Sequence, residues 1–143
     1  MTASFLRDES EFARDFTTPQ GAILKLEDAY RNKDIDAAVA AKHFRLEAEL
    51  MLSRLPLPHL LADDKVVAQT ATTLELAFRS QLEHGFPDMT GTRSSFSEAT
   101  LYTGVNGGLV VTEVVRYPDG RTSRQEMIVA ETENGWRVLI PMK

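Results

Sequence analysis

Glu113, Gln125 and Glu98 form the constellation in this sequence of 143 residues that is best suited to chemistry. They fall in expected strands, and the hairpin register described below places Glu113 opposite Gln125. A carboxylate that faces a cavity inside an apolar sheet is desolvated, which raises its pKa toward the range useful for proton transfer. The alternative is that this half of the sheet lies hydrated near an open rim. All three residues are therefore ligand-pocket candidates, with Glu113 as a weak catalytic candidate.

Three other side chains qualify as ligand-pocket candidates, namely His43, Tyr30 and Tyr102. His43, also a weak catalytic candidate, lies on an apolar stripe of an expected helix, and imidazole is the side chain that exchanges its proton near neutral pH. A histidine at the core edge with a backbone partner is the simpler interpretation, because spacing alone identifies no acid to position it. The two tyrosines are explained equally well as amphipathic residues at the edge of a core. We therefore assign no catalytic residue.

Metal and cofactor chemistry has little support in the sequence. The chain has no cysteine, and its three histidines (His43, His59 and His84) lack the i, i+4 spacing of a helical zinc pair. No acidic loop has calcium-site spacing, and the glycines form neither a phosphate loop nor a dinucleotide fingerprint. We expect no metal and no cofactor.

Charge and hydropathy narrow the partners. Sixteen basic against 21 acidic residues give a net charge of −5, and no basic run exceeds two residues, so nucleic acid is not an expected partner. No uncharged apolar run approaches the roughly 18 residues needed to span a membrane. The first ten residues lack the pattern of a secretory signal. Together with the absence of cysteine, these features lead us to expect a cytoplasmic protein without membrane contact.

Helical periodicity predicts three helices in the first part of the chain. Thr18 is a suitable cap for a helix that begins at Pro19, with Glu27 and Arg31 one turn apart on its wet side. A second helix is expected over residues 34–55, opened by an Asp cap and stopped by prolines. A third is expected over 63–84, with Phe78 buried against the sheet. Residues 1–16 are expected to form a short helix or a loose arm before a single domain over 17–143.

Alternating periodicity then predicts an antiparallel meander of four strands at 93–103, 109–117, 122–131 and 136–142. The intervening Asn-Gly-Gly, Pro-Asp-Gly and Asn-Gly segments are hairpin signals. Helices followed by a meander indicate an α+β domain, with three helices packed on a curved four-stranded antiparallel sheet.

Turn type also predicts the register of the sheet. A three-residue Pro-Asp-Gly loop places Val115 opposite Ser123, Glu113 opposite Gln125 and Val111 opposite Met127. A two-residue Asn134-Gly135 turn places Val129 opposite Ile140, and a tight turn at Asn106-Gly107 places Thr100 opposite Glu113. The face opposite the helices then carries an apolar set: Val110, Val114, Ile128, Ala130 and Leu139.

That apolar face predicts a homodimer formed through the sheet, because water should not contact all of it. The rival expectation is that the N-terminal arm, with Phe5, Leu6 and Phe12, covers this face in a monomer.

The order of elements resembles the nuclear-transport-factor-2-like superfamily over roughly residues 17–143. The likeness rests on the segment Ala29 to Asp34, where the second helix opens, and on the closing Gly135-Trp136. The resemblance implies a sheet curved around helices into a cone, often with a cavity, and pairing through the sheet. Members include isomerases, cyclases, epoxide hydrolases, binding domains and toxin-neutralising immunity proteins, so the fold does not fix the function.

Two departures from the enzyme members affect the expected function. A tyrosine that helps to hold an enolate oxygen in isomerase-like members corresponds here to Leu26, and residues 44–50 look helical where those enzymes carry a base on a strand. The long helices look more like uncharacterised bacterial members, some assigned as immunity proteins. We therefore expect a non-catalytic protein that binds a protein partner or a small apolar ligand. The alternative is a cofactor-free isomerase, cyclase or hydrolase that acts on an apolar ligand in the cone cavity.

Overall fold

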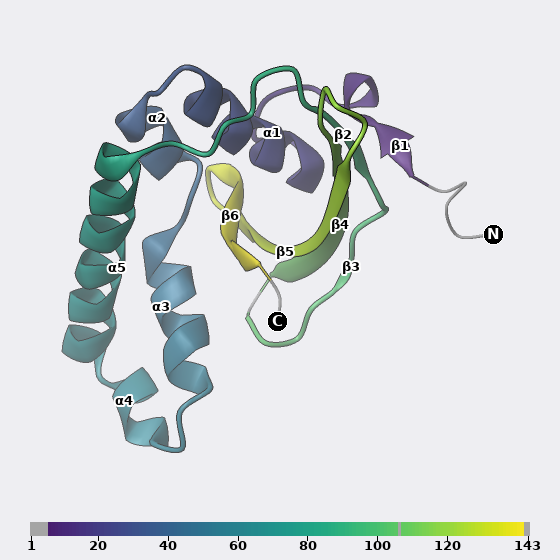
Figure 1. Cartoon of the computed structure of the whole chain (residues 1–143). Helices are drawn as coiled ribbons and strands as arrows, with labels where there is room; N and C mark the ends of the chain where they lie inside the picture. Colours follow the sequence, from purple (N-terminus) through teal and green to yellow (C-terminus); the bar gives the residue numbers. More distant parts are fainter. Residues whose placement is uncertain (1–5, 106, 142–143) are drawn as a thin grey trace.

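The computed structural model describes residues 6–105 and 107–141 and has an α+β fold (Figure 1). Its helices are a short 3-10 turn, η2 (Glu9–Glu11), and α1 (Pro19–Arg31), α2 (Ile35–Ala40), α3 (Phe44–Ser53), α4 (Pro58–Ala62) and α5 (Asp64–His84). Its strands are β1 (Arg7–Asp8), β2 (Arg93–Phe96), β3 (Thr100–Leu101), β4 (Gly108–Arg116), β5 (Thr122–Thr132) and β6 (Gly135–Pro141). The strands form an open antiparallel sheet in the order β1-β2-β4-β5-β6, with β3 also paired to β4. The α+β prediction is confirmed at this level.

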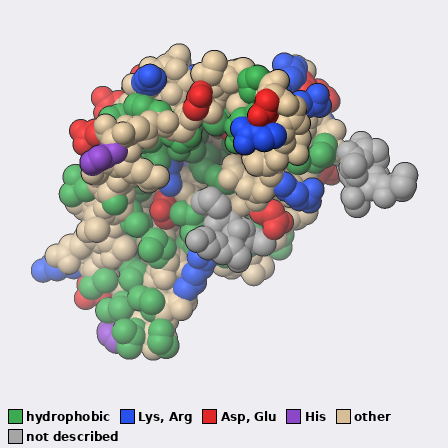
Figure 2. All heavy atoms as spheres, viewed as in Figure 1, with side chains coloured by type: hydrophobic (Ala, Val, Ile, Leu, Met, Phe, Trp, Pro, Cys, Tyr) green, Lys and Arg blue, Asp and Glu red, His purple; other side chains and the backbone are tan. Residues whose placement is uncertain are grey.

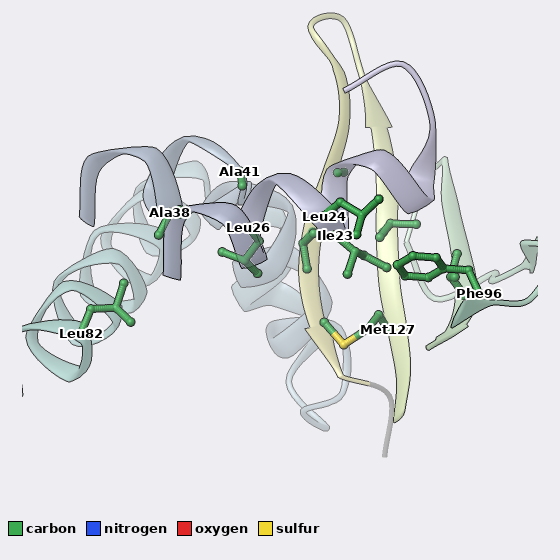
Figure 3. Close-up of a cluster of buried hydrophobic side chains, with 13 residues drawn as sticks. Ile23, Leu24, Leu26, Ala38, Ala41, Leu82, Phe96 and Met127 are labelled. Atoms are coloured by element: carbon green, nitrogen blue, oxygen red, sulfur yellow. The ribbon is translucent and has the colours of Figure 1, made fainter. Parts of the chain in front are cut away.

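Helix α1 packs on one face of the sheet and forms the main core (Figure 3). Its start follows the predicted cap, because the Thr18 hydroxyl accepts a hydrogen bond from the Gly21 amide at 2.9 Å and Pro19 is the first helical residue. Ile23 and Leu24 of this helix lie with Phe96 of β2 and Met127 of β5 in one buried cluster. The packing of this cluster determines which side of α1 faces the sheet.

The central hairpin has the predicted register. Glu113 pairs with Gln125, Val111 with Met127 and Val115 with Ser123. Because side chains alternate along a strand, this register places Glu113 on the same face as Val111, toward α1.

The last hairpin differs from the prediction by two positions. Val129 pairs with Val138 and not with Ile140, and Gly135 is the first residue of β6, paired with Thr132. Gly135 has φ +98°, and a Cβ there would come within 2.5 Å of the Phe16 carbonyl oxygen. This close approach to Phe16 places Gly135 in the strand and not in the turn. The two turn residues therefore both precede Gly135, whereas the prediction had Gly135 as the second of them.

The strand predicted over 93–103 is broken into β2 and β3. Phe96, not Thr100, pairs with Glu113, while Thr100 pairs with Val110. The Ser97 hydroxyl accepts the Thr112 amide at 2.9 Å, so a side chain replaces one backbone contact where the strand leaves the ladder. The tight turn predicted at Asn106-Gly107 includes Asn106, which lies outside the described residues; the Tyr102 amide donates to the Gly108 carbonyl oxygen at 3.0 Å.

The helix predicted over 34–55 is two helices, α2 and α3. The helix ends because Lys42 forms a parallel bridge with Val138 of β6, and the Val138 amide donates to the Ala41 carbonyl oxygen at 2.9 Å. His43 then caps α3, with its Nδ1 accepting the Leu46 amide at 3.1 Å. Pairing with the sheet thus outweighs continuous helical propensity.

Helix α5 begins and ends within one residue of the prediction, with Asp63 and Gly85 as its caps. It packs beside α3 and not on the sheet (Figure 1). Phe78 is therefore only half buried, against Phe44 of α3 at 5.7 Å between ring centroids. The predicted burial of Phe78 against the sheet is confirmed only in part, because its ring packs at the edge of the main cluster but stays half exposed beside a cavity.

The apolar face opposite α1 is already covered within the chain. Val110, Ile128, Ala130 and Leu139 are buried with Leu50 of α3 and Val105 of the β3–β4 loop, and only Val114 is half buried. The premise that water contacts this whole face is wrong, because α3 was expected elsewhere. The predicted homodimer therefore loses this support.

Residues 7–14 pack against the body. β1 pairs with β2, Phe12 packs edge-on against Phe96 at 5.6 Å, and Arg14 forms an ion pair with Asp28 of α1 at 2.7 Å. Phe12 thus belongs to the core on the α1 side, not to the opposite face; Phe5 lies outside the described residues.

Candidate functional site

A cavity of about 500 Å³ lies between α1, the end of α5 and the face of the sheet that α1 covers. Its lining combines apolar side chains with a few polar ones: Ile23, Leu26, Glu27, Tyr30, Lys42, Phe78, Gln81, Pro87, Met89, Glu113, Val115, Tyr117, Ser123, Gln125, Met127, Val138 and Leu139. This volume suits a small organic molecule, and a mostly apolar wall with few polar groups is typical of ligand sites.

Two carboxyl groups meet at one wall of this cavity. Glu113 of β4 is fully buried and Glu27 of α1 is 4% exposed. The Ser94 hydroxyl lies 2.8 Å from Glu113 Oε2 and 3.4 Å from Glu27 Oε1, so it connects the two groups. The Gln125 amide donates to Glu113 Oε1 at 3.0 Å. Both oxygens of Glu113 therefore accept hydrogen bonds.

Burial and the neighbouring carboxyl determine the protonation of this pair. Burial, followed by the hydrogen bond and charge of Glu113, raises the pKa of Glu27 to about 10. Two carboxylates that share a buried site do not both ionise readily, and donors favour the ionised form of the group they contact. The raised pKa keeps the proton on Glu27 at neutral pH, and the donors at both oxygens of Glu113 favour a negative charge on that side of the pair.

Tyr30 adds a neutral phenol to the same wall. Burial and then the charge of Glu27 raise the pKa of Tyr30 to about 12. Its ring packs edge-on against Phe86 at 6.4 Å between centroids. Tyr30 therefore offers a polar tip on an aromatic body to any molecule in the cavity.

The structure unites three of the residues that the sequence singled out. Glu113, Gln125 and Tyr30 all line the cavity. The expectation of a merely hydrated Glu113 is wrong, because Ser94 and α1 seal it from water, whereas Gln125 is exposed as expected of a rim residue.

The other three candidates lie elsewhere. Glu98 is exposed in the β2–β3 connection, since the register of β2 differs from the prediction. Tyr102 packs with the cluster on the opposite face and accepts a hydrogen bond from Arg54 at 3.3 Å. His43 is the cap of α3, and burial lowers its pKa. None of the three lines the cavity.

Glu27 and Ser94 were missed by the sequence analysis. Glu27 was placed on the wet side of its helix as a partner of Arg31, but Arg31 pairs instead with Asp28 at 3.1 Å. A signal was present, because Ile23, Glu27 and Tyr30 follow the i, i+4, i+7 spacing of one helical face. Since an acid on an apolar stripe is uncommon, that spacing marks Glu27 as a candidate for a buried role.

Within the ranges 6–105 and 107–141, no group of three His, Asp or Glu side chains is placed to hold a metal ion. None of the helices in the same ranges combines the length and the apolar character that a bilayer span requires. Comparisons with family models, with curated proteins and with solved structures found no match to this chain. The superfamily resemblance therefore stays a prediction, and the site has to be interpreted from its own geometry.

Proposed function

We propose that this protein binds a small, mostly apolar molecule in the cavity between α1, α5 and the sheet. The observation that carries the proposal is the cavity itself: about 500 Å³, walled by apolar side chains, with a buried carboxyl pair on one side. A buried charge is costly to maintain, so a carboxyl pair beside open volume favours a role in recognition over one in stability.

Blocking the cavity tests this proposal. Gln81 lies on α5 and lines the cavity, whereas Glu83 lies two residues further on, is exposed and does not line it. We expect the neutral fluorescent probe N-phenyl-1-naphthylamine to bind the wild type with increased emission. Gln81→Trp should weaken binding by about tenfold or more, since it removes part of the volume, and Glu83→Trp should leave it unchanged. Equal binding by both variants would place the probe outside the cavity.

The carboxyl of Glu27, which keeps its proton beside Glu113, favours a second candidate, a cofactor-free isomerase, cyclase or hydrolase. A carboxyl that keeps its proton at neutral pH can act as a general acid. If the superfamily resemblance holds, Leu26 takes the place of the tyrosine of isomerase-like members, so we expect no turnover of a steroid enone or an epoxide. Measured turnover that Glu113→Gln abolishes would instead establish the enzyme.

A protein partner would use a different surface. Four large apolar side chains are 40–46% exposed at the end of α3 and around α4: Met51, Leu55, Leu57 and Leu61. Figure 2 shows hydrophobic atoms gathered at this lower end of the molecule. This surface is the observation that supports the expected interaction role, including toxin neutralisation.

A further inference from the structure

The charges around the cavity do not balance. Ser94 and Gln125 donate to both oxygens of Glu113, which favours the negatively charged form at this wall, and both donors are themselves neutral. A carboxylate in such a place is normally offset by a cation held against it. The nearby cations therefore decide what charge the cavity presents to a ligand.

Both nearby cations in the described part of the chain, Lys42 and Arg31, form ion pairs with acids outside the carboxyl pair. Lys42 is the one cation among the described residues that line the cavity, and its ammonium lies 3.0 Å from Glu47 Oε1 and 2.7 Å from the Leu139 carbonyl oxygen. Arg31, the cation that acts on the charge of Glu27, forms an ion pair with Asp28. Neither side chain forms an ion pair with Glu27 or Glu113, so within the described residues neither of these cations contacts the carboxyl pair directly.

Aromatic and methionine side chains form part of the cavity wall: Tyr30, Phe78, Tyr117, Met89 and Met127. Two of these rings already face a cation of the chain, since Lys42 lies 4.9 Å from the Phe78 centroid and Arg121 lies 5.5 Å from that of Tyr117. Aromatic faces attract ammonium groups, with an added stabilisation that grows when the cation is desolvated. An apolar molecule with one ammonium group would satisfy both the charge and the walls.

We infer that the ligand of this cavity is an apolar amine, bound as its ammonium form beside Glu27 and Glu113. The inference rests on the proposed ligand-binding function and specifies its chemical class. A carboxylate ligand would add a second negative charge beside Glu113. A neutral alcohol of the same size would fill the volume but leave the existing charge unmatched.

Three probes with one apolar body and different head groups test the inference: 2-phenylethylamine, 2-phenylethanol and 3-phenylpropionate. Dissociation constants at pH 7 come from titrations followed by ¹H–¹⁵N NMR. We expect the amine to bind about tenfold more tightly than the alcohol, and the carboxylate to bind most weakly, because a unit charge at several ångströms is only partly screened in a cavity. Higher salt should reduce this preference only slightly.

Two matched variants locate the origin of the preference. Glu113→Gln removes the charge at the cavity wall and should reduce the amine-to-alcohol ratio to near one. Glu98→Gln changes the net charge by the same amount at an exposed position and should leave the ratio unchanged. Glu27→Gln, which keeps a neutral side chain beside Glu113, should retain the preference and serves if Glu113→Gln does not fold.

The outcomes separate this inference from the proposed function. If amine and alcohol bind equally and Gln81→Trp weakens both, the cavity binds ligands and the amine inference is overturned. Preferred binding of the carboxylate overturns it as well. If no probe shows binding that Gln81→Trp weakens, the proposed function fails and the inference fails with it.

Discussion

At the residue scale, the site depends on one proton. Glu113 accepts hydrogen bonds at both oxygens, and Glu27 lies beside it almost out of contact with water. Each carboxyl would be a costly buried charge if it were ionised, but a single proton on the pair leaves only one buried charge. The hydroxyl of Ser94 lies between the two carboxyl groups and connects them. The backbone amide of Ser94 donates a hydrogen bond to the Glu9 carboxylate of the N-terminal segment at 2.7 Å.

The raised pKa of Glu27 makes stability depend on pH. Its ordinary value is 4.5 and its folded value is about 10, so between these pH values the native state holds a proton that the unfolded chain has lost. The contribution to stability is complete below about pH 4.5 and is lost as the pH rises through 10. We expect the free energy of unfolding to fall with a slope approaching 1.4 kcal/mol per pH unit, about one proton.

Urea unfolding of Glu27→Gln between pH 5 and 9 measures this effect against the wild type. The variant should lose the slope, because a glutamine does not titrate, and Glu98→Gln should keep it. Parallel pH profiles for wild type and Glu27→Gln would mean that Glu27 is ionised in the folded protein.

At the scale of elements, the sequence predicts those that depend on local signals. Caps and apolar spacing define α1 and α5, and the Pro-Asp-Gly turn defines the register of β4 and β5. The errors arise where distant segments meet. The bridge from Lys42 to Val138 ends α2, and the contact between Gly135 and Phe16 shifts β6; neither leaves a periodicity in the sequence.

The same distinction explains the site. Glu113 and Gln125 are predicted because a hairpin turn relates them, and turn geometry is local. Glu27 and Ser94 join them only through the packing of α1 and β2 on the sheet, which sequence periodicity does not specify. Lys42 was likewise not predicted as a cavity residue, since it lies in a break within an expected helix.

Gly135 tests the contact that sets β6. Gly135→Ala should destabilise the protein more than Gly120→Ala. Both glycines have positive φ, but only at Gly135 would the added methyl carbon come within 2.5 Å of another atom, the Phe16 carbonyl oxygen. The φ strain shared by both should cost about 1–2 kcal/mol, and the clash should add about 1 kcal/mol or more. Thermal unfolding measures the difference; equal losses would show that the arm yields freely at Phe16.

At the scale of the whole molecule, the helices form two groups with different tasks. α1 closes the carboxyl-bearing face of the sheet, while α3 covers part of the opposite face and carries α5 beside it (Figure 1). The cavity lies where these groups meet at the sheet, lined by Leu26 of α1, Phe78 of α5 and Leu139 of β6. A ligand there would contact α1, α5 and the sheet at once, so binding should stabilise the whole fold.

The predicted homodimer through the sheet has to be tested at a residue that α3 leaves free. Ile128 is fully buried, so an aspartate there would place a charge in the core and unfold a monomer or a dimer alike. Val114 lies on the same face, is half buried and pairs with Ser95 and Arg124 at the polar end. If the sheet faces pair, Val114→Asp should convert a particle of twice 16.0 kDa into folded monomers, because it adds like charges across the twofold axis. Light scattering gives the mass and circular dichroism the folded state, and a wild-type mass near 16.0 kDa at micromolar concentration contradicts the dimer.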